Sequence, residues 1–196
     1  MSIALYLTLA RILMSPIFLV VYLYHESFGI SLIVLPYVLI VLLGLSELSD
    51  LFDGFLARKK NQVTDLGKIL DPMADSIFRL SVFLTFTQGL IKLPLLLVFV
   101  FLYRDTIIST LRTVCALRGV ALAARLSGKI KAVIQAITAF FILILMIPYS
   151  LGYIDLEYLR IISLYSVVVA AAYTIYSGVE YIYANRNYLR KALDRL

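Results

Sequence analysis

The sequence predicts an all-α, polytopic membrane protein, and three observations lead to this prediction. Of its 196 residues, 62% are hydrophobic and only 15% are charged, and the mean hydropathy is +0.97. Soluble domains are about half apolar and a quarter charged. Six stretches approach the length of about twenty apolar residues that a helix needs to cross a bilayer. Lys and Arg also gather in alternate connections between these stretches. Most of the surface must therefore be solvated by lipid.

The six apolar stretches follow one another with short connections. The first is longer than the core of a signal peptide and no small-residue cleavage site follows it, so we interpret it as a retained helix. The third is the weakest, because it carries Asp71, Asp75 and Arg79. No linker or soluble domain interrupts the series, so we predict one domain over residues 1–196. The predicted spans are Leu5–Tyr24, Ile30–Ser49, Ile69–Gln88, Leu93–Leu111, Ile130–Tyr149 and Tyr158–Tyr181.

The positive charges predict how the chain is oriented. Of the 18 Lys and Arg residues, 13 fall within residues 58–68, residues 112–131 and the tail from Arg186 to Arg195. With six spans these three regions lie on one side of the membrane, and cytoplasmic connections carry the excess of Lys and Arg. We therefore predict that both termini are cytoplasmic, in the inner (cytoplasmic) membrane. The net charge of +6 then reflects topology, and no nucleic-acid partner is expected.

Four aspartates flank the connection between the second and third spans. Asp50 and Asp53 are three residues apart, and Asp71 and Asp75 are four apart, so on helices each pair shares one face. So many carboxylates at a membrane edge repel one another unless nearby bases or divalent cations neutralise them. Oxygen ligands alone suit hard ions such as Mg²⁺ or Mn²⁺. Two such ions can clamp the attacking and leaving oxygens of a phosphoryl displacement.

The spacing of these residues resembles the signature of the CDP-alcohol phosphatidyltransferase family. The pattern Asp50-x2-Asp53-Gly54-x2-Ala57-Arg58-x8-Gly67-x3-Asp71-x3-Asp75 matches it without a gap. The resemblance implies six membrane helices, a homodimer, and a reaction in which an alcohol displaces CMP from a CDP-linked donor. It also implies that the four aspartates bind two metal ions and that Asp75 doubles as the base. Gly54, Arg58 and Gly67 are implied to contact the CDP moiety of CDP-diacylglycerol.

Two positions depart from the family's pattern. Members often carry an asparagine shortly before a Thr-x-x-Arg on the first span, but here only apolar residues and Tyr6 precede Thr8 and Arg11 closely. Ser76 follows Asp75, where members that use glycerol 3-phosphate often have lysine. The first departure leaves open what replaces the asparagine near the nucleotide, and the second weakens the choice of acceptor.

Three cationic residues later in the chain predict a site for the acceptor alcohol. Arg104 and Arg112 are eight residues apart on the fourth span, and Lys129 opens the fifth. A charged residue within a membrane span suggests a functional site, and a second anion site suggests an acceptor that carries phosphate. The stretch 103–112 also resembles members that use glycerol 3-phosphate, our favoured acceptor. We attribute Arg125 and Lys131 to topology and to contact with anionic lipid.

Two other functions stay open from the sequence. The first is a phosphatidylinositol-phosphate or phosphatidylserine synthase of the same family. The second, from another class, is a divalent-cation transporter that uses the aspartates as its selectivity site. Transporters place their charged sites near the middle of the membrane, whereas these acids lie at one edge and have no counterpart in the second half of the chain. We attribute the tyrosines of the last span to an interfacial aromatic belt and to helix packing, not to a site: they are Tyr173, Tyr176, Tyr181 and Tyr183.

Overall fold

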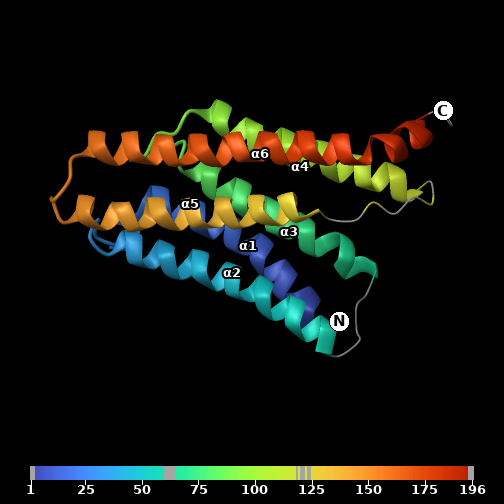
Figure 1. Cartoon of the computed structure of the whole chain (residues 1–196). Coiled ribbons are helices and arrows are strands. Elements are labelled where there is room, and N and C mark those ends of the chain that lie inside the picture. Colours follow the sequence, from blue (N-terminus) through green and yellow to red (C-terminus); the bar gives the residue numbers. More distant parts are fainter. Residues whose placement is uncertain (1–2, 60–64, 118, 120–121, 123–124, 194–196) are drawn as a thin grey trace. The chain divides into compact units, whose positions relative to one another are not determined.

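The computed structural model describes the backbone of residues 3–59, 65–117, 119, 122 and 125–193. It describes the side chains of residues 6, 8–49, 73–117, 119, 122, 125–186 and 188. Every regular element within these ranges is a helix (Figure 1). In chain order they are α1 (Ile3–Tyr24), the 3-10 helix η1 (His25–Phe28), α2 (Leu35–Lys59), α3 (Asp65–Thr85), α4 (Leu95–Leu117), α5 (Leu126–Ser150) and α6 (Leu156–Leu193).

Each predicted span coincides with one α-helix, but several ends differ. The second helix begins at Leu35 and not at Ile30, because Gly29 is left-handed (φ 69°) and turns occupy residues 32–34. Pro36 then takes the first turn, where a missing N–H costs nothing. The third and fifth helices each begin four residues before the predicted spans, and α6 continues to Leu193. Hydropathy marks the apolar part of a helix and not its polar ends.

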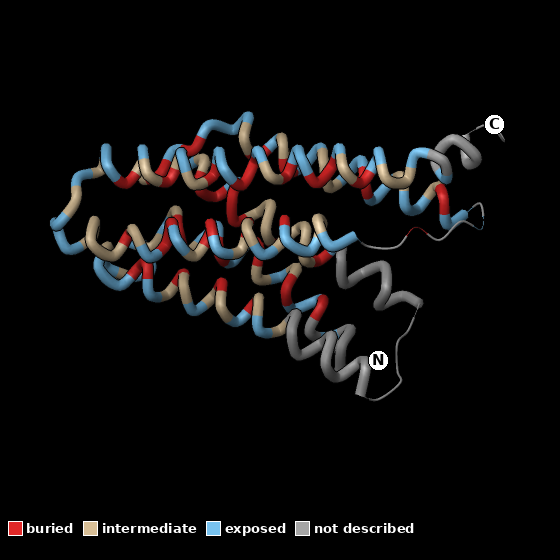
Figure 2. Tube along the Cα trace, in the orientation of Figure 1, coloured by how far each residue is buried: buried red, intermediate tan, exposed pale blue. Residues whose placement is uncertain are grey.

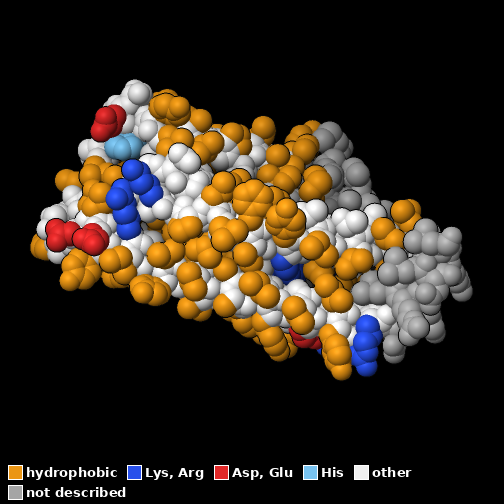
Figure 3. Space-filling model, turned by 90° about the horizontal axis from the view of Figure 1, so that it is seen from above, with side chains coloured by type: hydrophobic (Ala, Val, Ile, Leu, Met, Phe, Trp, Pro, Cys, Tyr) orange, Lys and Arg blue, Asp and Glu red, His pale blue; other side chains and the backbone are white. Residues whose placement is uncertain are grey.

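Three of the described helical segments are long and apolar enough to cross a membrane: Thr8–Phe28, Leu126–Ser150 and Leu156–Arg186. The apolar part of α2 among the described residues, Leu35–Ser49, is shorter. Large apolar side chains are nevertheless exposed on every α-helix, and in Figure 3 they cover most of the described surface in view. Exposed apolar surface of this extent indicates a membrane environment. The prediction of six spans with cytoplasmic termini stays a prediction.

The helices form two compact units. Unit one comprises residues 1–93 and 139–163, and unit two comprises residues 94–138 and 164–196. In unit one α1 packs against α2 and α3. Phe18 of α1 meets Phe78 of α3 and Phe86, the residue that follows α3, edge to face, with ring centroids 6.3 and 6.1 Å apart. Figure 2 shows how buried residues recur along each helix, which is the pattern of a one-sided packing stripe.

Tyr22 fixes the connection that follows α3 in unit one. Its hydroxyl accepts hydrogen bonds from the N–H groups of Leu90 and Ile91, both at 3.2 Å. It donates to the carbonyl oxygen of Gln88 at 3.3 Å. Gly89 is left-handed (φ 63°), and a Cβ there would lie 2.7 Å from the Tyr22 ring. Glycine is therefore required at this turn. Asp71 and Asp75 lie in the first half of α3, and this brace holds the opposite end of the helix.

Candidate active site

The four predicted metal ligands lie on two helices of unit one. Asp50 and Asp53 belong to α2, and Asp71 and Asp75 belong to α3. Only residues 60–64 separate the two helices, so both pairs flank one short connection. The side chains of residues 50–72 lie outside the described part of the chain, which leaves the environment of Gly54, Arg58 and Gly67 unassigned along with three of the aspartates. Among the described side chains no three potential ligands are grouped around a metal site. The metal site therefore stays a prediction.

Asp75 is the one aspartate of the motif whose side chain is described. Its Oδ1 accepts a hydrogen bond of 2.6 Å from Arg79 Nη2, one turn further along α3. Arg79 Nε also lies 3.5 Å from Glu47 Oε1 of α2. Through these two contacts Arg79 connects α2 and α3, the helices that carry the motif. Its side chain is only 11% exposed. The spacing of Arg79 from Asp75 is that of a helical ion pair, a signal that is present in the sequence but is no part of the family motif.

The Thr-x-x-Arg segment of α1 turns into the packing of unit one. Thr8 is 1% exposed and Arg11 is 2% exposed. A buried guanidinium is retained only where polar groups compensate for the loss of water, and both residues do have polar or electrostatic partners. Because α1 packs on both α2 and α3, these buried groups belong to the same helical layer as the aspartate motif.

Unit two holds a separate cluster of buried charges. Asp105 of α4 accepts hydrogen bonds from Lys131 Nζ of α5 at 2.7 and 3.0 Å. Its Oδ1 is also 3.0 Å from Arg104 Nη1. The three side chains are only 7–13% exposed. The expectation that Lys131 is a surface charge in contact with lipid is wrong, because Lys131 forms a buried bridge between two helices.

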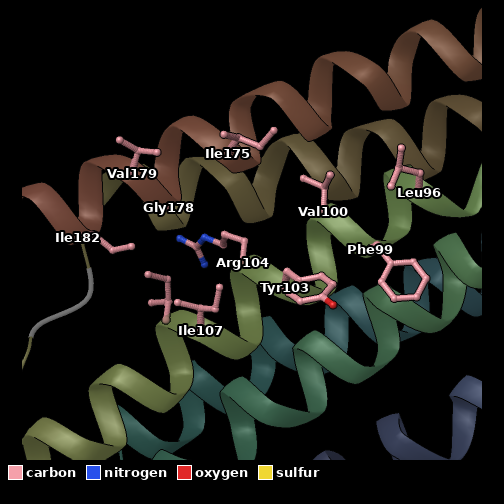
Figure 4. A pocket seen from close by; sticks show the side chains of 11 residues that line it. Leu96, Phe99, Val100, Tyr103, Arg104, Ile107, Ile175, Gly178, Val179 and Ile182 are labelled. Carbon is pink, nitrogen blue, oxygen red and sulfur yellow. The ribbon is translucent and has the colours of Figure 1, made fainter.

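The side chain of Arg104 lies close to two glycines, one on α6 and one on α5. A Cβ at Gly178 of α6 would lie 3.1 Å from Arg104 Cγ, and a Cβ at Gly128 of α5 would lie 3.3 Å from its Nη2. Figure 4 shows the guanidinium beside Gly178, at the edge of a pocket of about 630 Å³ between α4 and α6. The other side chains that line the pocket are apolar or aromatic, among them Tyr103. Small residues thus let a large cation lie between the helices.

The predicted acceptor residues differ in their surroundings. Arg104 is largely buried, whereas Arg112 and Lys129 are exposed, and Lys131 is the lysine that shares Asp105 with Arg104. Close by in the fold, Glu180 of α6 accepts bonds of 2.6 Å from both Ser127 and Arg125. Arg125 therefore links the start of α5 to α6, which the sequence analysis did not anticipate. The structure shows no direct contact among Arg104, Arg112 and Lys129 in the described residues.

Comparison with known proteins decides the family. Residues 1–176 match the family model of CDP-alcohol phosphatidyltransferases. The chain belongs to this family. It is 32% identical over 185 residues to a protein of Rickettsia typhi, a match that covers 93% of this chain and 96% of the relative. It is also 32% identical to a protein of Bacillus subtilis, with 91% and 92% covered. Both relatives are described as CDP-diacylglycerol–glycerol-3-phosphate 3-phosphatidyltransferases.

Family membership shows that the protein is an enzyme of phospholipid synthesis. It also argues against the alternative of a divalent-cation transporter. A match over nearly the whole chain to a family of phosphatidyltransferases is not expected of a divalent-cation transporter. The potential ligands also fit the metals that the resemblance implies. The single histidine of the sequence, His25, has its Nδ1 2.9 Å from the carbonyl oxygen of Ile30, and the single cysteine, Cys115, is buried in unit two. Neither belongs to the aspartate motif. The motif offers carboxylate oxygens, the ligands that Mg²⁺ and Mn²⁺ prefer.

Proposed function

We propose that this enzyme transfers the phosphatidyl group of CDP-diacylglycerol to glycerol 3-phosphate, which releases CMP and forms phosphatidylglycerophosphate. The observation that carries the proposal is the match of over nine-tenths of the chain to relatives described as performing this transfer. The cationic side chains of unit two support an acceptor that carries phosphate. The alternatives within the family, a phosphatidylserine or phosphatidylinositol-phosphate synthase, have no comparable relative among the proteins compared above.

The proposed chemistry assigns a task to each part of the motif. The acceptor hydroxyl oxygen attacks the phosphorus that bears the diacylglycerol, the bond from that phosphorus to CMP breaks, and Asp75 takes the hydroxyl proton. Asp50, Asp53, Asp71 and Asp75 would hold two Mg²⁺ or Mn²⁺ ions, which stabilise the negative charge on the diphosphate as CMP leaves. Gly54, Arg58 and Gly67 would contact the CDP moiety. Backbone without a side chain at the two glycines allows the nucleotide to approach closely.

Arg79 adds a role that the motif does not contain. It bonds to Asp75 and lies close to Glu47, so it restricts the orientation of the Asp75 carboxylate. A base that must reach one particular proton benefits from such a restriction. We assign Arg79 as a positioning residue.

The acceptor site would consist of Arg104, Arg112 and Lys129. Arg104 is held from one side by Asp105, and the other two residues are exposed and can turn toward an anion. A guanidinium binds phosphate oxygens through several N–H groups in a fixed geometry. This arrangement favours glycerol 3-phosphate over choline, serine or free glycerol.

The setting of the enzyme follows from the same proposal. We propose one catalytic domain over residues 1–196 with six spans and both termini in the cytoplasm, where phosphorylated acceptors are found. The bilayer around it would be the inner membrane, and the active form would be a homodimer. The lipid donor then reaches the enzyme from the bilayer and the acceptor from water.

The test is CMP release from the purified protein with CDP-diacylglycerol and a panel of acceptors. We expect glycerol 3-phosphate to be used in preference to inositol phosphate, serine, inositol and glycerol. EDTA should abolish turnover, and Mg²⁺ or Mn²⁺ should restore it, because the motif offers only carboxylate ligands. The Asp53→Asn variant serves as the inactive control. Preference for serine or for inositol phosphate would refute the acceptor, and full turnover in EDTA would refute the metals.

A further inference from the structure

Tyr181 of α6 is buried, and its hydroxyl group has no hydrogen-bond partner among the described residues. The residue is 3% exposed and packs in unit two against Ile108 and Cys115 of α4 and against Leu122. Its hydroxyl is buried without a partner in the described part of the chain. Buried tyrosine hydroxyls usually find a partner. This one therefore needs an explanation.

Neighbouring hydroxyl groups of α6 show how the same helix satisfies such groups elsewhere. Thr174 Oγ1 donates to the carbonyl oxygen of Ala170 at 2.8 Å, and Ser177 Oγ donates to that of Thr174 at 2.9 Å. These short side chains reach the backbone of their own helix. The hydroxyl of Tyr181 stands at the end of a rigid ring and cannot do so. Its partner must come from another element or from a ligand.

Tyr181 packs among apolar side chains, and three arginines are near enough to act on it electrostatically. Arg112, Arg104 and Arg125 all lie within electrostatic range of the Tyr181 side chain. Glu180, the residue that precedes Tyr181 on α6, pairs with Ser127 and Arg125 instead. A hydroxyl that has arginines within electrostatic range and an O–H to donate is suited to an anion, which could accept from the hydroxyl and from an arginine together.

Arg104 provides a second buried donor without a partner. Its Nη1 bonds to Asp105, but its Nε has no partner among the described residues. Arg104 passes Gly178, which precedes Tyr181 by one helical turn on α6. Two buried donors from α4 and α6 are thus left unused in the same part of unit two. A phosphate monoester, with three terminal oxygens, can accept from several such donors at once.

We propose that the Tyr181 hydroxyl donates a hydrogen bond to the phosphate of the acceptor alcohol and thereby helps the enzyme select phosphorylated over neutral acceptors. This inference rests on the proposed function, because it deepens the description of the acceptor site. It also goes beyond the interpretation of the α6 tyrosines as an aromatic belt and helix packing. Tyr176 and Tyr183 are 60% and 67% exposed, as a belt requires, whereas Tyr181 is packed inside unit two.

The test compares the full-length Tyr181→Phe variant with the wild type in the CMP-release assay. Loss of a hydrogen bond to a charged group should raise the KM for glycerol 3-phosphate by about tenfold or more. The KM for CDP-diacylglycerol should not change, and the preference for glycerol 3-phosphate over glycerol should fall by a similar factor. Inorganic phosphate, used as a competitive inhibitor against glycerol 3-phosphate, should lose potency in parallel.

Thermal unfolding separates this role from a structural one. Phenylalanine keeps the ring and removes a buried hydroxyl without a partner, so the melting temperature should stay equal or rise. The matched control is Tyr176→Phe, whose ring is exposed on the same helix. It should change neither KM nor melting temperature.

Three outcomes would overturn the inference. The first is a wild-type KM for glycerol 3-phosphate in Tyr181→Phe, and the second is unchanged inhibition by phosphate. The third is a lower melting temperature with equal rises in both KM values, which would indicate a packing role only. In each case a wild-type enzyme that uses glycerol 3-phosphate would leave the proposed function intact. A wild type that uses only neutral acceptors would refute both.

Discussion

At the residue scale, the pairing of Asp75 with Arg79 makes a sharp prediction about the base. Asn at position 75 keeps the size of the side chain, and its amide oxygen can still accept the bond from Arg79, but it cannot take a proton. We therefore expect Asp75→Asn to lower kcat at least about a hundredfold, the usual order for general-base catalysis. The KM for CDP-diacylglycerol should change much less. Steady-state CMP release measures both.

A neighbouring carboxylate provides the control for this experiment. Glu47 also contacts Arg79 but is no part of the motif. Because Gln keeps an oxygen that can accept from Arg79, we expect Glu47→Gln to lower kcat far less than Asp75→Asn does. In contrast, Asp50→Ala and Asp71→Ala should weaken binding of the metal or of the donor lipid. If Asp75→Asn turned over at the rate of the wild type, Asp75 would not be the base.

Arg112 carries the second prediction at this scale. It is exposed on α4 and lies within electrostatic range of Tyr181. A charge-assisted bond to phosphate is worth about 1.5–3 kcal/mol, so Arg112→Ala should raise the KM for glycerol 3-phosphate about ten- to a hundredfold. The KM for CDP-diacylglycerol should stay nearly unchanged.

Arg186→Ala is the matched control for Arg112. Arg186 is also an exposed arginine of unit two, but it stacks on the Tyr183 ring at 4.2 Å. We expect this variant to keep the wild-type KM for both substrates. Equal rises for both substrates in Arg112→Ala would indicate a general electrostatic effect and would contradict a specific acceptor contact.

At the element scale, the sequence predicts which stretches are helical better than where they begin. Runs of apolar residues reveal six helices because lipid selects for them. The turn at residues 32–34 is equally apolar, so hydropathy includes it in the second span. Only Gly29 and Pro36 signal the break. The start of α5 at Leu126 and the end of α6 at Leu193 lie in polar sequence, where hydropathy is silent.

The partners of individual side chains were harder to predict than the helices. The aspartate motif was recognisable because its spacing is fixed within two adjacent helices. Lys131 and Tyr181 depend instead on which faces of α4, α5 and α6 meet, and no local pattern encodes that choice. A lysine near a membrane edge and a tyrosine in the last span have common explanations, topology and the aromatic belt. Their burial in unit two became apparent only from the packing.

The link between α4 and α5 gives a prediction about stability. Asp105 and Lys131 are buried in one ion pair, and removal of one partner leaves the other charge poorly compensated. Asp105→Asn and Lys131→Met should therefore each lower the melting temperature in detergent. The double variant should lose less than the sum, with a coupling of about 0.5–3 kcal/mol. Asp155→Asn, at an exposed position between α5 and α6, should have no effect. Strict additivity would show that the pair contributes no coupling.

At the scale of the whole molecule, the number of helices that cross the bilayer can be decided by labelling. Six spans place the connection at Ser27 and the connection at Tyr153 on the same side of the membrane. If only the segments Thr8–Phe28, Leu126–Ser150 and Leu156–Arg186 crossed, these two connections would lie on opposite sides. The two topologies therefore make opposite predictions for one pair of positions, both exposed in the structure.

The chain suits this experiment because Cys115 is its only cysteine and is buried. In a Cys115→Ala background we would introduce Ser27→Cys, Tyr153→Cys or Arg195→Cys, one at a time. An impermeant maleimide added to right-side-out vesicles should label the first two variants. The Arg195→Cys variant should be labelled only in inverted vesicles, since positive charge is retained on the cytoplasmic side. Labelling of Ser27→Cys and Tyr153→Cys from opposite sides would reject six spans. With that result, the N-terminus and the C-terminus would lie on opposite sides of the membrane, and the prediction that both are cytoplasmic would be wrong.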